Sequence, residues 1–363
     1  MASAVPAGLE LHDGFVRVVD DGHHADFHLR WLRHNCDRDR HPTTGERTVE
    51  SAELPDVLAV DDAAIDDGAL VIRWAHDRRV SRFALAWLRA HAYARDRPAV
   101  SRPPSDVATL ELDGAGGPAA APATLLDRVL ARLATSGAAL IRREAAAPED
   151  ETEAWIAGFE AHGLRVIGTH FGRIEDLRTD NTTNANTDQL GYTDTGIDLH
   201  TDQPFLATVP RYQVLQGIRA ADEGGDTLLA DARAAFAYLA SLDRDAAHRL
   251  ATTPVRFHRR QRSFEREVVA PIVSLAGPEG FQIRSSYFTT APFQVPFDDM
   301  DAWYRAHDRF VRVLREPRNQ YRFRIHPGDV LVYDNHRMVH GRTGFRGPRW
   351  VRGVYLDRAD AAA

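Results

Sequence analysis

The chain has 363 residues, of which 44% are hydrophobic and 27% are charged, proportions typical of a globular protein with room for two domains. Its formal net charge of −7 argues against a general nucleic-acid binder, since such proteins are usually basic. The single cysteine, Cys36, excludes an intramolecular disulfide and a cysteine metal cluster, and it favours a reducing compartment.

The N-terminus lacks the basic start and the apolar core of a secretory signal peptide. No apolar run approaches the length of about 18 residues that spans a bilayer. We therefore expect a cytoplasmic protein that binds neither membranes nor nucleic acids.

Residues 9–95 are predicted to form a small N-terminal domain with strands first and a helix last. Short alternating segments between Asp and Gly turns predict strands at 9–12, 14–19, 25–30 and 69–74. Apolar spacing after a possible N-cap at Ser81 predicts a helix over 81–93. Residues 96–122 are rich in Pro, Gly and Ala, which predicts a linker.

Residues 123–360 are predicted to form the larger domain, mainly β with flanking helices. Helices are expected at 123–135, 148–162, 231–250 and 298–315. Short apolar or alternating segments predict many strands, at 138–141, 205–209, 212–218, 227–230, 268–275, 281–288, 321–325 and 329–334. Many short strands with Gly and Pro turns are typical of a sandwich or a jelly-roll barrel.

The first chemical motif is His200-Thr201-Asp202, at the end of a predicted strand. If the strand is regular, its period of two places both side chains on one face. The composition alone gives about two His-x-Asp/Glu pairs by chance, and His24-Ala25-Asp26 is another such pair. A hydrogen-bonded surface pair is therefore the default interpretation unless further ligands accompany it.

Further candidate ligands lie near the C-terminus. A Pro-Gly-Asp turn at 327–329 leads into an apolar strand that ends at His340-Gly341-Arg342, and Arg349 opens a final strand nine residues after His340. Two histidines and one carboxylate that leave coordination positions open are the ligands of non-heme Fe(II) oxygenases.

In this order, with Gly224-Gly225-Asp226-Thr227 between them, the motifs resemble the taurine dioxygenase and γ-butyrobetaine hydroxylase superfamily of Fe(II)/2-oxoglutarate oxygenases. Residues 31–36, Trp-Leu-Arg-His-Asn-Cys, resemble the small N-terminal domain of the γ-butyrobetaine and trimethyllysine hydroxylases. The resemblance spans nearly the whole chain. It implies a double-stranded β-helix (jelly roll, cupin-like) catalytic domain, a small β-rich N-terminal domain and a homodimer.

The resemblance also implies the catalytic residues. His200, Asp202 and His340 would bind Fe(II), while Arg349 would pair with the distal carboxylate of 2-oxoglutarate and Thr227 would assist it. With O₂, the enzyme would convert 2-oxoglutarate to succinate and CO₂ as it hydroxylates an aliphatic C–H bond.

The spacing from His340 to Arg349 is shorter than is common in this family. Arg352 is therefore a weaker candidate for the same task.

Enzymes of this branch oxidise small molecules with a quaternary ammonium group held by aromatic side chains, and an aromatic face attracts a desolvated cation. The predicted substrate residues are Tyr192, Tyr355, Phe171 and Glu175, the last in place of a tryptophan, with Asn186, Gln189 and Tyr287 as further candidates. Asn186 and Gln189 belong to an amide-rich loop, 179–189, which suits the anionic end of a carboxylate or phosphonate. Core packing for the aromatic residues and a plain surface loop for 179–189 remain alternatives.

In the resembling N-terminal domain, three cysteines and a histidine bind zinc. Here Cys36 remains, but Arg38 and His41 stand at the next two cysteine positions. Structural zinc needs four good ligands, and arginine is not one. We therefore expect no zinc in this domain, with His41 and His76 as remnants.

Three other functions remain open. The same iron chemistry could act on an amino acid or a biosynthetic intermediate. A non-catalytic metal-binding barrel is disfavoured by the intact His200, Asp202, His340 and Arg349. A zinc hydrolase with the same ligands would have no need for Arg349 and Thr227.

Overall fold

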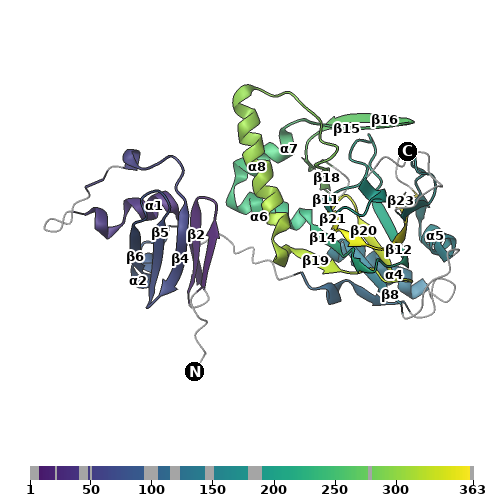
Figure 1. Cartoon of the computed structure of the whole chain (residues 1–363), viewed down its shortest axis with the longest axis horizontal. Coiled ribbons are helices and arrows are strands. Elements are labelled where there is room, and N and C mark those ends of the chain that lie inside the picture. The colour runs from purple at the N-terminus through teal and green to yellow at the C-terminus, as the bar shows by residue number, and fades with distance from the viewer. Residues whose placement is uncertain are drawn as a thin grey trace. The chain divides into compact units, whose positions relative to one another are not determined.

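The protein is described by a computed structural model that covers residues 8–20, 23–40, 48–49, 51–93, 105–114, 123–143, 151–178, 190–276 and 280–359. The chain divides into two compact units, Met1–Val100 and Ser101–Ala363 (Figure 1). In these ranges, every helix is too short or too polar to cross a membrane.

The first unit contains two three-stranded antiparallel sheets, in the orders β1-β2-β3 and β4-β5-β6. Its elements are β1 (Gly8–His12), β2 (Phe15–Asp20), β3 (His23–His28), α1 (Leu29–His34), β4 (Val60–Asp66), β5 (Ala69–Trp74), β6 (Val80–Ala84) and α2 (Leu85–Ala90). Side chains from both sheets and both helices form one core, which includes Phe27, Leu32, Ile72, Trp74 and Leu88.

The helix predicted over 81–93 is wrong in its first half. Residues Val80–Ala84 alternate between buried and exposed and pair with β5, so packing against that strand overrides the helical spacing. Ser81 is not an N-cap but a buried core residue. Its hydroxyl accepts a hydrogen bond from Trp74 Nε1 at 2.7 Å and donates one to Cys36 Sγ at 3.0 Å.

The second unit is built on two larger sheets. A seven-stranded sheet has the order β10-β23-β12-β20-β8-β7, with β9 also paired to β23, and a four-stranded sheet has the order β11-β21-β14-β19. The strands of the first are β7 (Glu111–Asp113), β8 (Ala138–Arg142), β9 (Leu164–Val166), β10 (Glu175–Arg178), β12 (Tyr212–Arg219), β20 (Val330–Asp334) and β23 (Trp350–Arg358). Those of the second are β11 (Ile197–His200), β14 (Thr227–Asp231), β19 (Gln320–Phe323) and β21 (Met338–Arg342).

Short elements connect these sheets. Three strand pairs are β13 (Glu223–Gly224) with β22 (Phe345–Arg346), β15 (Val255–Gln261) with β16 (Phe264–Ala270), and β17 (Val273–Ser274) with β18 (Gln282–Ile283). Single 3-10 turns occur at Asp37–Asp39, Ser51–Glu53, Val107–Thr109, Leu190–Tyr192 and Pro317–Asn319.

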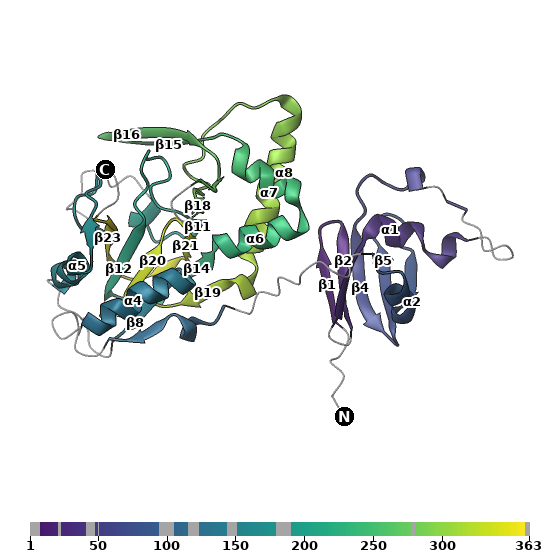
Figure 2. The same cartoon turned by 180° about the vertical axis from the view of Figure 1, so that it is seen from behind.

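The two faces of the seven-stranded sheet bury different cores. Val214, Val332 and Val354 pack against helices α4 (Ala123–Ser136) and α5 (Glu151–Ala161), which cover one face (Figure 2). The alternate residues, such as Leu215 and Leu331, meet Leu229 and Phe323 of the four-stranded sheet. A strand with both faces buried has a nearly continuous run of apolar residues in its sequence, and β20 is an example.

Three further helices, α6 (Ala232–Leu242), α7 (Arg244–Thr252) and α8 (Phe297–Arg315), pack in one cluster with Ala230 and Val339 of the four-stranded sheet (Figure 1). The single helix predicted over 231–250 is wrong, because Asp243 has extended backbone and its carboxylate caps α7 by accepting from Ala246 N at 2.9 Å. The prediction of a mainly β architecture with flanking helices is confirmed.

Candidate active site

His200, Asp202 and His340 converge between two paired strands. His200 ends β11 and lies opposite His340 on β21, next to a register shift in β11. The Nε2 atoms of His200 and His340 are 3.4 Å and 3.9 Å from Asp202 Oδ1. Among the described residues, these three form the one group of at least three histidine, cysteine or acidic side chains that could hold a metal ion. Their possible ligand atoms all lie within 4.8 Å of one another.

Asp202 is held in place by a remote asparagine. Asp202 N donates to Asn335 Oδ1 at 2.9 Å, and Asn335 Nδ2 donates back to Asp202 O at 3.0 Å. Asn335 follows β20 and is fully buried. Gln203, the residue after Asp202, has a φ of +57°, so the chain turns sharply away from β11 directly after the carboxylate. Such support fixes the direction of a ligand before any metal arrives.

The segments on either side of Asp202 are also fixed. Thr201 N donates to Ser285 O at 2.6 Å, and Ser285 N donates to Thr201 Oγ1 at 2.9 Å. The buried Arg284 guanidinium donates to three backbone carbonyls of the following loop, those of Pro204, Leu206 and Ala207. Residues 205–209, predicted as a strand, are therefore an irregular segment anchored by Arg284.

The protonation states of the three side chains suit a metal. Burial acts to raise the pKa of Asp202, but the imidazoles of His340 and His200 and the Tyr355 hydroxyl outweigh it, so this pKa lies well below its ordinary value. Burial, and then His200, lower the pKa of His340 to about 3. His200 Nδ1 lies 2.8 Å from Asp198 O and donates to it, because a carbonyl only accepts, so Nε2 is the ring nitrogen that faces Asp202 and is available to a metal.

These observations test whether iron fits the group. Two neutral imidazoles and one ionised carboxylate are the forms in which these side chains bind metal. Tyr355 OH donates to Asp202 Oδ2 at 3.0 Å, as the outer partners of metal-binding carboxylates do. The donor set fits a divalent iron site with open positions.

A cavity opens beside the three side chains. Its lining contains five of the other residues predicted from the sequence: Thr227, Arg349, Tyr355, Phe171 and Glu175. It also contains residues that the sequence did not single out, among them His170, Gln203, Gln213, Arg259, Phe288 and Arg342.

Arg349 provides a positive charge on the cavity wall. In the described part of the chain its guanidinium has no carboxylate partner and lies over the Phe345 ring at 5.7 Å. Burial, and then the neighbouring Arg342, lower the pKa of Arg349 to about 9.

Thr227 stands nearby at the start of β14, opposite Arg342 in the sheet, and is buried. Arg352, the alternative arginine, does not line the cavity. Its Nε donates to Asp176 Oδ1 at 2.9 Å. Arg349 is thus the better placed of the two for an anion in the cavity.

Glu175, Phe171 and Tyr355 line the cavity together. Glu175 begins β10, is buried, and pairs with Gly353, two residues before Tyr355 on β23. Tyr192 is not part of the lining. Its hydroxyl donates to Glu175 Oε1 at 3.1 Å and its ring meets Phe171 edge-to-face with centroids 6.3 Å apart, so a direct contact of Tyr192 with substrate stays a prediction.

Of the remaining predicted substrate residues, the structure describes only Tyr287. Tyr287 is 54% exposed and outside the lining, whereas its neighbour Phe288 lines the cavity and packs on His200 with ring centroids 5.0 Å apart. Asn186, Gln189 and His41 lie outside the described residues. The roles of all four predicted residues stay predictions.

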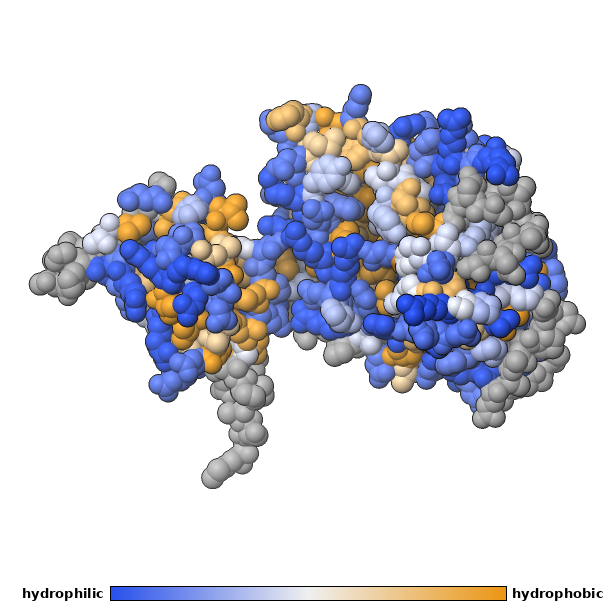
Figure 3. Space-filling model, viewed as in Figure 1, coloured by the Kyte–Doolittle hydropathy of each residue, from blue (hydrophilic) through white to orange (hydrophobic). Residues whose placement is uncertain are grey.

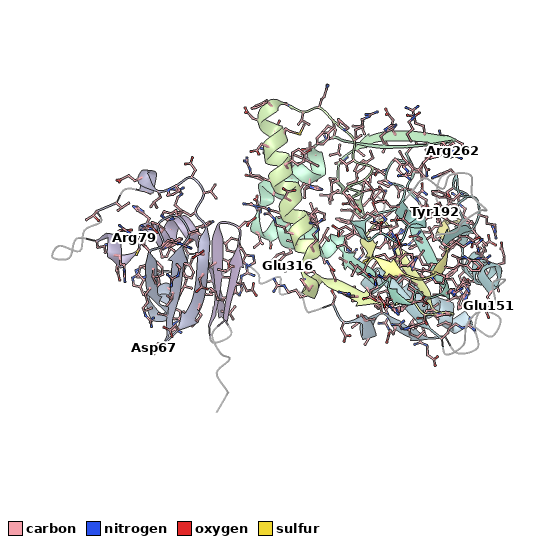
Figure 4. The ribbon with its side chains drawn as sticks, viewed as in Figure 1. Asp67, Arg79, Glu151, Tyr192, Arg262 and Glu316 are labelled. Carbon is pink, nitrogen blue, oxygen red and sulfur yellow. The ribbon has the colours of Figure 1, made fainter. Side chains whose placement is uncertain are left out.

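The β15–β16 hairpin contributes to the cavity although no sequence motif predicted this. Arg259 of β15 lines the cavity, and Phe264 of β16 stacks on His170 with centroids 3.7 Å apart and planes 12° apart. Arg262 marks the hairpin turn in Figure 4, on the same side of the unit as Tyr192, and the surface there is mostly hydrophilic (Figure 3). Gln213 could have been found, because it is a buried polar residue in the largely apolar strand β12.

Comparison with known proteins adds a family. The family model described as "Taurine catabolism dioxygenase TauD, TfdA family" matches residues 103–355. The chain is 30% identical over 353 residues to a gamma-butyrobetaine dioxygenase of Pseudomonas sp. (strain AK-1), covering 93% of this chain and 89% of that protein. It is 26% identical over 349 residues to the mitochondrial trimethyllysine dioxygenase of Bos taurus, covering 92% of this chain and 80% of the relative.

Among solved structures, the non-heme iron oxygenase OrfP in complex with Fe, succinate and (3S)-hydroxy-L-Arg has a similar fold. It shares 22% sequence identity at a TM-score of 0.52, over 67% of this chain and 82% of OrfP.

Proposed function

This chain belongs to the taurine catabolism dioxygenase TauD, TfdA family and is an iron- and 2-oxoglutarate-dependent dioxygenase, and on that premise we propose that it hydroxylates an aliphatic C–H bond of a small betaine-like cation or zwitterion. The observation that carries the proposal is the cavity itself. It joins a metal-ligand group to an arginine without a carboxylate partner in the described chain and to a buried carboxylate among aromatic rings.

In this proposal His200, Asp202 and His340 hold the iron, which when bound supplies O₂ activation coupled to the conversion of 2-oxoglutarate to succinate and CO₂. Arg349 binds the distal carboxylate of 2-oxoglutarate, since a guanidinium fork matches a carboxylate, and Thr227 assists it. The Asn335 and Tyr355 hydrogen bonds to Asp202 would keep this ligand oriented toward the metal.

The substrate class follows from the charges in the cavity. Glu175 and the rings of Phe171 and Tyr355 suit a cationic end, and Arg259 suits an anionic end. The names of the two relatives, gamma-butyrobetaine dioxygenase and trimethyllysine dioxygenase, indicate small zwitterionic substrates for those proteins. A betaine-like carboxylate or phosphonate is therefore the first class to test.

We propose the architecture to be a small N-terminal domain over 9–95, a linker over 96–122, and a double-stranded β-helix over 123–360. The facing seven- and four-stranded sheets and the division of the chain between Val100 and Ser101 support this proposal. A cytoplasmic homodimer remains the working expectation for the enzyme.

The test is succinate formation by the purified full-length chain with Fe(II), O₂ and 2-oxoglutarate, against a panel of betaines, aminophosphonates and amino acids. We expect turnover with a zwitterion of the panel, and its loss together with iron binding in His340→Ala. His162→Ala serves as the control, because His162 lies at the end of α5 and bonds Gly158 O at 2.8 Å. Iron binding without 2-oxoglutarate binding or turnover would instead support a non-catalytic metal-binding barrel, and turnover of amino acids alone would replace the betaine-like class.

A further inference from the structure

Gln213 offers two amide N–H groups to the cavity. This residue of β12 is only 2% exposed, and it lines the cavity. Its Oε1 accepts a hydrogen bond from the Tyr333 hydroxyl, whereas its Nε2 donates to no residue in the described part of the chain. A buried N–H group without an acceptor is costly, so this amide indicates a ligand that brings an oxygen to it.

Tyr333 fixes the orientation of the amide. Tyr333 is fully buried, and among the described residues its hydroxyl has Gln213 as its hydrogen-bond partner. A neutral tyrosine has a proton to donate and needs an acceptor for it. The amide oxygen must therefore face Tyr333, which leaves the Nε2 hydrogens for the cavity.

Sheet pairing places Gln213 beside the metal-ligand group. Gln213 pairs with Tyr333 on β20 and with Tyr355 on β23, so the three side chains lie side by side on one face of the sheet. The Tyr333 ring packs on His340 with centroids 5.0 Å apart, and Tyr355 OH donates to Asp202 Oδ2 at 3.0 Å. Both neighbours of Gln213 therefore touch a residue of the metal-ligand group.

Arg349 belongs to a different part of the cavity. It directly precedes β23, at the end where Trp350 pairs with Arg219, the last residue of β12. Gln213 is the second residue of β12, near the other end of this strand pair. A cosubstrate with oxygens at both ends can thus meet Arg349 with one end and Gln213 with the other. In 2-oxoglutarate these are the distal carboxylate and the 2-oxo acid end, which is the end that chelates a metal.

We propose that Gln213 binds 2-oxoglutarate by donating a hydrogen bond from Nε2 to the carboxylate of its 2-oxo acid end. This inference rests on the proposed function and adds to it a binding residue for the chelating end of the cosubstrate. Arg349 and Thr227 bind the distal end, so the two groups of residues together fix the direction in which 2-oxoglutarate lies.

Two chelating anions test this contact. 2-Oxoglutarate and oxalate both present adjacent oxygens to a metal, but oxalate has no distal carboxylate. Their dissociation constants are measured calorimetrically without O₂ on the full-length chain loaded with Fe(II), for the wild type, Gln213→Leu and Arg349→Ala. The Fe(II) dissociation constant of each protein is measured separately.

We expect Gln213→Leu to weaken the binding of both anions about 10- to 100-fold, the range for a hydrogen bond to a charged group. Arg349→Ala should weaken 2-oxoglutarate alone, because oxalate has no second end for the guanidinium. The Fe(II) affinity of Gln213→Leu should match that of the wild type, since the amide bonds Tyr333 and not a metal ligand.

Two variants serve as controls. Gln216→Leu replaces the other buried glutamine of β12, whose Oε1 accepts from Thr152 Oγ1 at 2.6 Å and which does not line the cavity, so the affinity for both anions should stay that of the wild type. Tyr333→Phe breaks the same hydrogen bond as Gln213→Leu but leaves the amide in the cavity. It should therefore weaken both anions less than Gln213→Leu does.

The outcomes separate the inference from the proposed function. If 2-oxoglutarate binds to Gln213→Leu as tightly as to the wild type, or if Tyr333→Phe weakens it equally, the inference is wrong and the oxygenase assignment stands. If Gln213→Leu weakens 2-oxoglutarate but not oxalate, the amide does not contact the chelating end, which also overturns the inference. If 2-oxoglutarate fails to bind to the wild type loaded with Fe(II), the proposed function fails first.

Discussion

The Arg349 guanidinium offers a direct test of how the cavity binds 2-oxoglutarate. Replacing it with alanine removes a cation that has no carboxylate partner in the described chain, so the folded protein loses little while the cosubstrate loses its counter-charge. A hydrogen bond to a charged group contributes about 1.5–3 kcal/mol. We therefore expect Arg349→Ala to raise the KM for 2-oxoglutarate roughly 100-fold, the equivalent of about 3 kcal/mol.

The pH dependence gives an independent readout of the same residue. Because burial lowers the pKa of Arg349 to about 9, the guanidinium of the free enzyme is charged at pH 7 and loses its charge as the pH rises through 9. The value of kcat/KM for 2-oxoglutarate reports on the free enzyme, so above pH 9 it should fall about tenfold for each pH unit in the wild type. This fall should be absent in Arg349→Ala, which starts from a low value.

Arg352→Ala is the matched control, because Arg352 lies on the same strand and bonds Asp176 outside the cavity lining. Its KM for 2-oxoglutarate should stay within about threefold of the wild-type value, as expected for a partly exposed ion pair. Initial rates of succinate formation at varied 2-oxoglutarate concentration and pH measure both effects. A large rise in KM in Arg352→Ala with none in Arg349→Ala would refute the assignment and exchange the two arginines.

Two further predictions concern residues that act away from the cavity wall. Asn335→Ala removes two hydrogen bonds to the backbone of Asp202. It should weaken Fe(II) binding about 10- to 100-fold in an anaerobic metal titration. An unchanged affinity would mean that Asp202 needs no such support. Ser81→Ala leaves the buried Trp74 Nε1 without its acceptor. It should lower the free energy of unfolding, measured in urea, by about 1–3 kcal/mol without changing the KM for 2-oxoglutarate. An unchanged urea midpoint would contradict the stabilising role of this hydrogen bond.

The sequence by itself determined the chemistry of this protein. The order of the motifs from His200 to Arg349 indicated the oxygenase family, and the metal-ligand group and the cavity contain the residues that those motifs named. This was possible because residue type carries the chemistry, and each motif is short enough to be recognised without its surroundings. Local patterns failed where packing competed with them, as at Val80–Ala84, where pairing with β5 replaced a helix.

Only the tertiary structure decided how these motifs are held and what surrounds them. Asn335 reaches Asp202 across 133 residues of chain, and Arg259 reaches the cavity on a hairpin without any motif of its own. The register of β10 against β23 places Glu175 opposite Gly353, two residues before Tyr355, and both Glu175 and Tyr355 line the cavity. Such contacts are selected by sheet pairing and by packing between distant segments, and neither the period nor the composition of any one segment contains them.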